Sequence, residues 1–226
     1  MKENTALNEK EGVIKFSLDY TDTPLPKCIV ECCEETLSTL NAWRNILKQL
    51  GMLGQNPERY AGLSFGNISI RSQPGNDAFL ITGTQTGKLD YLQQQHFSLV
   101  TATNTDHNRI EATGEIRPSS EALTHASIYT TDPTAQAIIH IHYPLIWQMT
   151  SQLNLPATNA NIAYGTSAMA TAVANIVQSI PADQPTVFSM LGHEDGVVAY
   201  GTNIEIVAQT LIGLLALALK FDKDST

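Results

Sequence analysis

The chain has few cysteines, few aromatic residues and few cations for its length. Of 226 residues, 3 are Cys, 7% are Phe, Trp or Tyr, and 13 are Lys or Arg against 22 Asp or Glu. The cysteines lie together in CIVECC (28–33) with no distant partner, which favours reduced thiols over a disulfide framework. A zinc site on this segment is the alternative, but the Cys-x3-Cys-Cys spacing lacks a second pair of ligands.

The shortage of cations also bears on nucleic acids. The formal net charge is −9, and the Lys and Arg residues are scattered along the chain. A field of that sign repels phosphate backbones unless a local basic patch overrides it. We therefore expect no nucleic-acid partner.

Long apolar runs are missing as well. The segment MKENTALNEKEGVIKF (1–16) has no apolar stretch of the kind that secretory signals carry. The most apolar window, 204–221, is interrupted by Glu205, Gln209 and Thr210, which favours a packed C-terminal helix over a membrane span. The sequence predicts a cytoplasmic protein without a membrane partner.

What is present suffices for one domain, because 42% of the residues are hydrophobic. We expect a polar N-terminal arm over 1–27 and a single domain over 28–226. Residue patterns predict helices at 28–50, 119–129, 145–152, 166–179 and 204–221, strands at 66–71, 78–82, 97–103 and 134–142, and two short strands within 186–201. This order is typical of an α/β (α+β) fold with helices packed on a mostly antiparallel sheet.

Two histidines interrupt the apolar segment AIIHIHYPLIW (137–147). Alternate residues of a strand point to the same face, so His140 and His142 project together and suit one metal ion. His193, in LGHEDG, is the best candidate for a third ligand because it lies beside glycines at a strand end. The alternative is that these histidines are ordinary polar groups of a strand, and His96, His107 and His125 have weaker contexts.

The segment RPSSEALTH (117–125) places two serines and a glutamate at an expected helix start. Unpaired N–H groups there, with Ser119 and Ser120, could hold an anion, and Glu121 could move a proton. An ordinary glutamate of a first helical turn is the alternative. A further set of hydroxyls, amides and glycines occurs in GNIS (66–69) and ITGTQTGK (81–88).

Taken together, five motifs resemble the class II aldolase/adducin family: GNIS, LITGTQTG, RPSSEALTH, AIIHIHYP and LGHEDGVVAYG, which occur in this order within residues 36–221. The resemblance implies a three-layer α/β/α sandwich and a homotetramer with sites between neighbouring subunits. It implies a metal held by His140, His142 and His193, with Zn the first choice and Mn, Fe, Co or Ni possible.

The same resemblance implies the roles of other residues. Glu121 is implied as the acid or base, and the substrate or its phosphate would be bound by Asn67, Thr82, Gly83, Thr84, Ser119 and Ser120. The implied reaction is a retro-aldol cleavage of a small hydroxy-carbonyl or sugar-phosphate substrate, in which the metal stabilises an enediolate. A sugar-phosphate dehydratase, a non-catalytic adducin-like binding module and a closed structural zinc site are the alternatives.

Four features depart from the family pattern. Gln85 stands where the phosphate loop usually has glycine, and Asn161 stands where the epimerases have an aspartate, which excludes epimerisation by that group. No tyrosine follows Tyr200, whereas the aldolases use C-terminal tyrosines. Glu194 and Asp195 follow the third histidine, where we expect them at most to orient His193.

Overall fold

A computed structural model describes residues 13–73, 75–181 and 185–224. Its main sheet has nine strands in the order β1-β7-β6-β5-β4-β8-β11-β10-β9. The strands are β1 (Ser17–Asp22), β4 (Asn67–Arg71), β5 (Phe79–Thr82), β6 (Phe97–Asn104), β7 (Arg109–Gly114), β8 (Ala137–His142), β9 (Ala157–Thr158), β10 (Thr186–Met190) and β11 (Gly196–Gly201). Apart from the parallel pairs β1–β7 and β9–β10, neighbouring strands run antiparallel, as expected.

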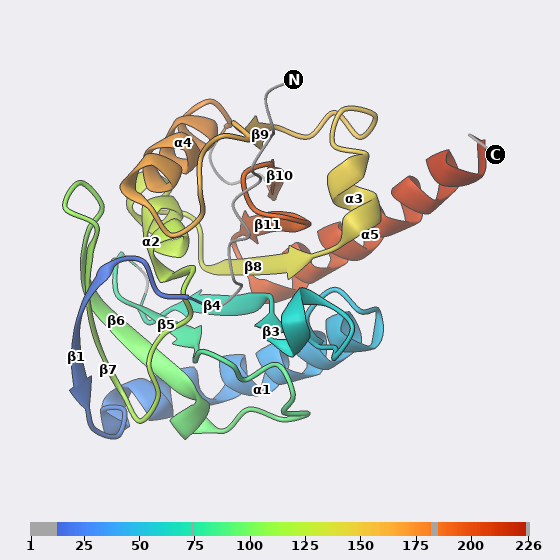
Figure 1. Cartoon of the computed structure of the whole chain (residues 1–226). Helices are drawn as coiled ribbons and strands as arrows, with labels where there is room; N and C mark the ends of the chain where they lie inside the picture. Colours follow the sequence, from blue (N-terminus) through green and yellow to red (C-terminus); the bar gives the residue numbers. More distant parts are fainter. Residues whose placement is uncertain (1–12, 74, 182–184, 225–226) are drawn as a thin grey trace.

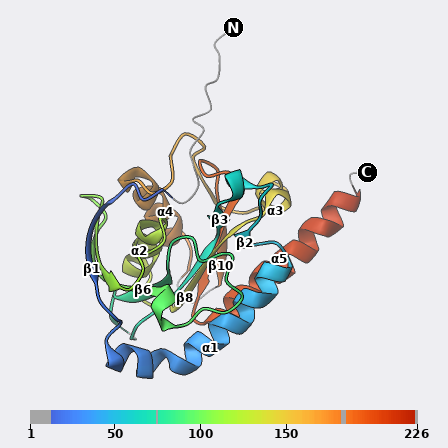
Figure 2. The same ribbon diagram turned by 60° about the horizontal axis from the view of Figure 1, so that its bottom comes forward.

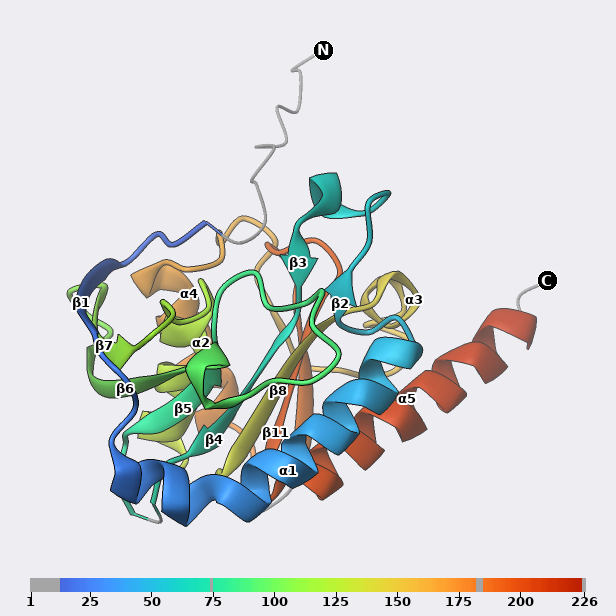
Figure 3. The same cartoon turned by 90° about the horizontal axis from the view of Figure 1, so that it is seen from below.

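Helices cover both faces of this sheet (Figure 1). They are α1 (Lys27–Gln49), α2 (Ala122–Thr131), α3 (Pro144–Gln148), α4 (Ser167–Gln178) and α5 (Ile204–Asp224). Helices α2 and α4 lie on one face, and α1 and α5 lie side by side across the other (Figures 2 and 3). The three-layer α/β/α arrangement predicted from the sequence is confirmed.

Strand β8 shows why the sequence folds this way. Its side chains alternate between the faces, so Ile139 and Ile141 pack in the core under α1 and α5, whereas Ile138 packs in the core under α2 and α4. All six residues of the strand are buried. His140 and His142 share the face of Ile138, and burial of the aliphatic neighbours on both faces fixes this register.

The N-terminal segment contributes to the sheet. Within the arm expected over 1–27, Ser17–Asp22 forms β1 and pairs with β7 at one edge, while residues 1–12 lie outside the described part. The boundary at residue 28 stays a prediction. Four features of the structure are not predicted by the sequence patterns: β1, β7, β9 and the small hairpin of β2 (Gly54–Gln55) and β3 (Ser64–Phe65). Helix α3 is shorter than the helix expected at 145–152.

Helix α5 is the one helix among the described residues that is long and apolar enough to cross a membrane. In the structure it packs against β8, β11 and α1, with Val207, Ala208 and Leu211 fully buried. One face of α5 is thus packed on the sheet, as expected of a packed C-terminal helix, and its length and composition are only weak support for a membrane span. The cytoplasmic location stays a prediction.

Candidate active site

Three buried histidines meet at the end of strand β8. His140 and His142 lie on one face of the strand, and the turn between β10 and β11 brings in His193, because Gly196 pairs with His142 and donates its N–H to the carbonyl of His193 at 2.9 Å. One ring nitrogen from each histidine lies within 4.8 Å of the others. The geometry expected from the sequence is therefore present.

The electrostatics of the cluster suit a metal ion. Burial, with the neighbouring imidazole of His193, lowers the pKa of both His140 and His142 well below the ordinary value, so both rings are neutral and each offers a lone pair. Neither ring nitrogen of His140 has a hydrogen-bond partner among the described residues, although the side chain is fully buried. An unsatisfied buried nitrogen is costly unless a ligand takes it, so the residues fit a divalent metal.

Glu121 lies beside this cluster at the start of α2. Its side chain is 1% exposed, Oε1 is 3.7 Å from Nδ1 of His193, and Oε2 accepts a hydrogen bond from the hydroxyl of Thr124 at 2.9 Å. Helix α2 begins at Ala122 rather than at the expected residue 119, and Glu121 takes its N-terminal capping position. A carboxylate there is favoured by the unpaired N–H groups of the helix. The arrangement places a proton acceptor next to His193, so a small molecule bound at the histidines could contact it.

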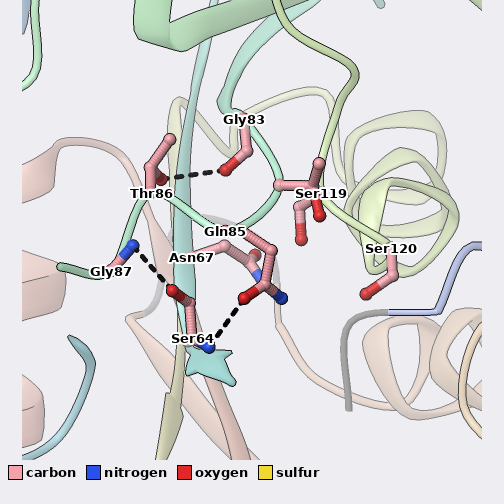
Figure 4. A pocket seen from close by; sticks show the side chains of 10 residues that line it. Ser64, Asn67, Gly83, Gln85, Thr86, Gly87, Ser119 and Ser120 are labelled. Carbon is pink, nitrogen blue, oxygen red and sulfur yellow. Dashed lines mark hydrogen bonds between the residues drawn. The ribbon is translucent and has the colours of Figure 1, made fainter. Parts of the chain in front are cut away.

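The structure has a polar hollow of about 310 Å³, with the space open to solvent included, and Figure 4 shows the residues that line it. One of its lining residues, Asn67, pairs with His140 across β4 and β8, so the hollow lies next to the strand that carries two of the histidines. The lining residues are Ser64, Gly66, Asn67, Gly83, Thr84, Gln85, Thr86, Gly87, Ser119 and Ser120. The structure thus brings five of the six expected substrate-binding residues together.

Thr82 is the sixth, and it is not among the residues that line this hollow. Its hydroxyl accepts a hydrogen bond from the N–H of Ile68 at 3.2 Å and it lines a second, smaller hollow. Ser64 was not predicted as a lining residue, because it belongs to the two-residue strand β3, which is too short to show a periodic pattern in the sequence. Its hydroxyl accepts a hydrogen bond from Gly87, which ties β3 to the loop after β5.

Gln85 occupies the wall of the hollow. It adopts a left-handed backbone conformation (φ 56°), and its Oε1 accepts a hydrogen bond from the backbone N–H of Ser64 at 3.0 Å. Behind the same loop, the buried guanidinium of Arg44 donates to the carbonyls of Thr86 and Leu89 at 3.0 and 2.8 Å. The loop is therefore held from both sides, by α1 and by β3.

Aromatic and cationic groups surround His193. The ring of Tyr164 stacks on His193 with centroids 4.4 Å apart and planes inclined by 18°, and the ammonium of Lys15 lies 3.8 Å from the centre of the Tyr164 ring. Lys15 belongs to the N-terminal segment before β1. The sequence does not predict either contact, since Lys15, Tyr164 and His193 lie far apart in the chain.

Comparison with known proteins places this arrangement in a family. The model of the class II aldolase and adducin N-terminal domain matches residues 56–221. The chain belongs to this family, which confirms the resemblance inferred from the motifs. Class II aldolases are metal-dependent, and the three histidines of this chain could bind a metal ion.

Individual relatives agree with this assignment. A 3-oxo-tetronate 4-phosphate decarboxylase from Escherichia coli O6:H1 is 35% identical over 83 residues, which are 37% of this chain and 35% of that protein. The match thus spans about a third of the curated relative.

Solved structures show the shared fold. YgbL from Klebsiella pneumoniae superposes with a TM-score of 0.62 at 18% identity, covering 84% of this chain and 89% of that one. L-fuculose-1-phosphate aldolase from Thermus thermophilus gives 0.56 at 18% identity, covering 82% and 89%. A sugar-phosphate aldolase from Thermotoga maritima gives 0.60 at 17% identity, covering 85% and 97%.

Proposed function

We propose that the chain is a metal-dependent carbon–carbon lyase that acts on a small hydroxy-carbonyl compound, with a sugar phosphate as the leading class and retro-aldol cleavage as the leading reaction. The observation that carries the proposal is the position of Glu121, whose Oε1 lies 3.7 Å from His193 of the three buried histidines and which directly follows Ser119 and Ser120 in the lining of the polar hollow. As part of the same proposal, the enzyme is a cytoplasmic homotetramer with its sites between neighbouring subunits.

His140, His142 and His193 would hold the metal, with zinc favoured for three imidazoles and Mn, Fe, Co or Ni as other candidates. When bound, a divalent cation supplies electrostatic stabilisation for negative charge that develops on substrate oxygens during cleavage. The neutral state of His140 and His142 is the state that such binding requires.

The chain's own groups divide the remaining work. Glu121 accepts or returns the proton on the substrate, while the hydroxyl of Thr124 holds Oε2 so that Oε1 faces the histidines. Asn67, Thr84, Ser119 and Ser120 offer hydroxyls and amides to the far end of the substrate. Gly83 forms part of the wall of the hollow, and Thr82 supports it by holding the N–H of Ile68 on β4.

Decarboxylation is the second candidate reaction, favoured by the similarity to the 3-oxo-tetronate 4-phosphate decarboxylase. Loss of CO2 from a 3-oxo acid leaves its electron pair next to a carbonyl, as aldol cleavage does, so the same charge stabilisation serves both. A dehydratase and an adducin-like binding module remain alternatives. A binding module has no need for three buried histidines beside a buried carboxylate.

The test is elemental analysis of tag-free protein by mass spectrometry. We expect about one divalent metal per chain in the wild type, as in catalytic zinc sites. His140→Ala should lose it, and His107→Ala, which alters an exposed histidine of the β6–β7 turn, should keep it.

Metal-loaded protein is then offered sugar phosphates, their unphosphorylated analogues and 3-oxo acids, with release of an aldehyde, of water or of CO2 as the readout. Folded wild-type protein that takes up no metal on dialysis against Zn²⁺, Mn²⁺ or Co²⁺ would contradict the proposal and favour the binding module.

A further inference from the structure

The loop between β2 and β3 closes one side of the histidine cluster. Tyr60 and Ala61 adopt left-handed backbone conformations (φ 49° and 55°), followed by Gly62 at 74°. For residues other than glycine this conformation costs roughly 1–2 kcal/mol each. A chain holds two such residues in succession only where surrounding contacts compensate, so the contacts of this loop are informative.

Tyr60 makes the central contact. Its ring meets the ring of His142 edge-on, with centroids 4.8 Å apart and planes at 70°, and it meets Phe65 in a similar way at 5.0 Å. Its hydroxyl donates a hydrogen bond to Oδ2 of Asp195 at 2.6 Å. Burial and this bond raise the pKa of Tyr60, so the hydroxyl keeps its proton and remains a donor.

Arg59 completes the group from the other side. Its Nη2 donates to the hydroxyl of Tyr60 at 2.7 Å and to the carbonyl of His142 at 3.1 Å, and its Nη1 donates to the carbonyl of Gly51 at 3.1 Å. The cation of Arg59 and the carboxylate of Asp195 are thus joined through one tyrosine hydroxyl. Hydrogen bonds to charged groups are stronger than neutral ones.

Asp195 belongs to the turn that carries His193. It has a left-handed backbone (φ 60°), is 8% exposed, and its carbonyl accepts a hydrogen bond from the N–H of Tyr143, the residue after His142. Its carboxylate is not among the three metal-ligand candidates. The bond from Tyr60 therefore links the β2–β3 loop, the end of β8 and the turn of His193.

We propose that Tyr60 is a positioning residue for the metal centre. Through its ring it fixes the imidazole of His142, and through its hydroxyl it fixes the turn that presents His193, with Asp195 and Arg59 as its anchors. The inference rests on the proposed metal-dependent function. It assigns a role to Asp195, which follows the third histidine and which the reaction itself leaves unused.

The experiment compares Tyr60→Phe with Tyr91→Phe, a control at a tyrosine that is 58% exposed. Zinc affinity is measured by competition with a chromophoric chelator, the visible absorption of the Co²⁺ form reports ligand geometry, and thermal unfolding of the metal-free protein reports the loop's structural contribution. Removing a group that orients metal ligands typically weakens metal affinity by about 10- to 100-fold.

We expect Tyr60→Phe to lose at least about tenfold in zinc affinity and to change the Co²⁺ spectrum, and Tyr91→Phe to match the wild type. Asp195→Asn, which keeps a hydrogen-bond acceptor but removes the charge, should lie between them. Unaltered affinity and spectrum in Tyr60→Phe, with only a lower unfolding temperature of the metal-free form, would make Tyr60 a loop anchor and overturn the positioning role. A wild-type protein that binds no metal would instead overturn the proposed function as a whole.

Discussion

Nδ1 of His193 lies 3.7 Å from Oε1 of Glu121, although one residue comes from the turn before β11 and the other from the start of α2. Helix α2 packs on the same face of the sheet as the histidines, and this packing brings the two side chains together. Both are almost fully buried. Oε2 of this carboxylate is held by Thr124, while Oε1 faces the imidazole that we propose as a metal ligand, which suits Glu121 to move a proton of a substrate bound there.

The first prediction follows from that contact. Glu121→Gln keeps the size of the side chain and an oxygen for Thr124, so the fold and the metal content should remain. Turnover with the substrate found by screening should fall by about 10²- to 10⁴-fold, the usual contribution of general acid–base catalysis. Glu111→Gln, on the exposed face of β7, is the control. Full activity in Glu121→Gln would remove this residue from the mechanism.

A second prediction concerns Gly66 in the GNIS motif. Its φ is 72°, and a Cβ there would lie 2.6 Å from Cβ of Leu53 and 2.9 Å from the carbonyl oxygen of His140. Gly66→Ala therefore combines backbone strain with a clash, and we expect it to lower the free energy of unfolding by about 2–5 kcal/mol. Metal affinity should weaken too, because the clash falls on β8.

Gly75→Ala separates the two causes. Gly75 has nearly the same φ, 77°, but nothing lies within 4 Å of its Cβ position. It should lose only about 1–2 kcal/mol, as backbone strain predicts. Urea denaturation of both variants measures the difference. Equal losses would mean that packing around Gly66 yields to the added methyl group.

Local sequence patterns predicted the part of the site that lies on regular elements. The two-residue period of β8 placed His140 and His142 on one face, and the motif that surrounds Glu121 marked a helix start. The contact between Tyr60 and Asp195 joins residues 135 positions apart and depends on three left-handed residues in a loop. No periodicity in the sequence carries that information.

The missed strands have a similar explanation. In β7, buried Ile110 and Ala112 alternate with the exposed Arg109 and Glu111, so the strand reads as polar even though it is paired on both sides. Short strands such as β3 hold too few residues to show a period, and Ser64 was missed with it. Tertiary pairing decides such segments.

A third prediction concerns acid stability. His125 is fully buried, Nδ1 lies 2.7 Å from the hydroxyl of Ser69, and burial lowers its pKa to about 3. In the unfolded chain a histidine titrates near pH 6.5, so between about pH 6.5 and pH 3 the unfolded state binds a proton that the folded state does not. Stability is therefore complete above about pH 6.5 and falls as the pH drops through this window.

His125→Asn isolates this contribution, because the amide can still reach Ser69 and does not titrate. In metal-free protein the free energy of unfolding falls with decreasing pH also because of His140 and His142. The slope of this fall should be smaller in the variant than in the wild type, by up to about 1.4 kcal/mol per pH unit. Urea denaturation at several pH values from about 7 to about 4.5 measures both slopes. Parallel curves would show that His125 takes up its proton in the folded state at an ordinary pH.

The last prediction concerns the occupant of the polar hollow. Gln85 engages the N–H of Ser64 and extends along the wall, and no Lys, Arg or His is among the residues that line the hollow. Gln85→Gly should preserve the loop, because glycine adopts φ 56° without strain. It frees one N–H donor and enlarges the space.

A hydrogen bond to a charged group contributes about 1.5–3 kcal/mol, so Gln85→Gly should bind inorganic phosphate about tenfold or more tightly than the wild type in calorimetric titration. Asn154→Gly is the control, since Asn154 has a similar φ of 52° on the surface away from the hollow. Equal phosphate affinity in both variants would show that Gln85 does not limit anion binding. A gain confined to Gln85→Gly would mean that the Gln85 side chain limits the affinity of the wild-type hollow for phosphate.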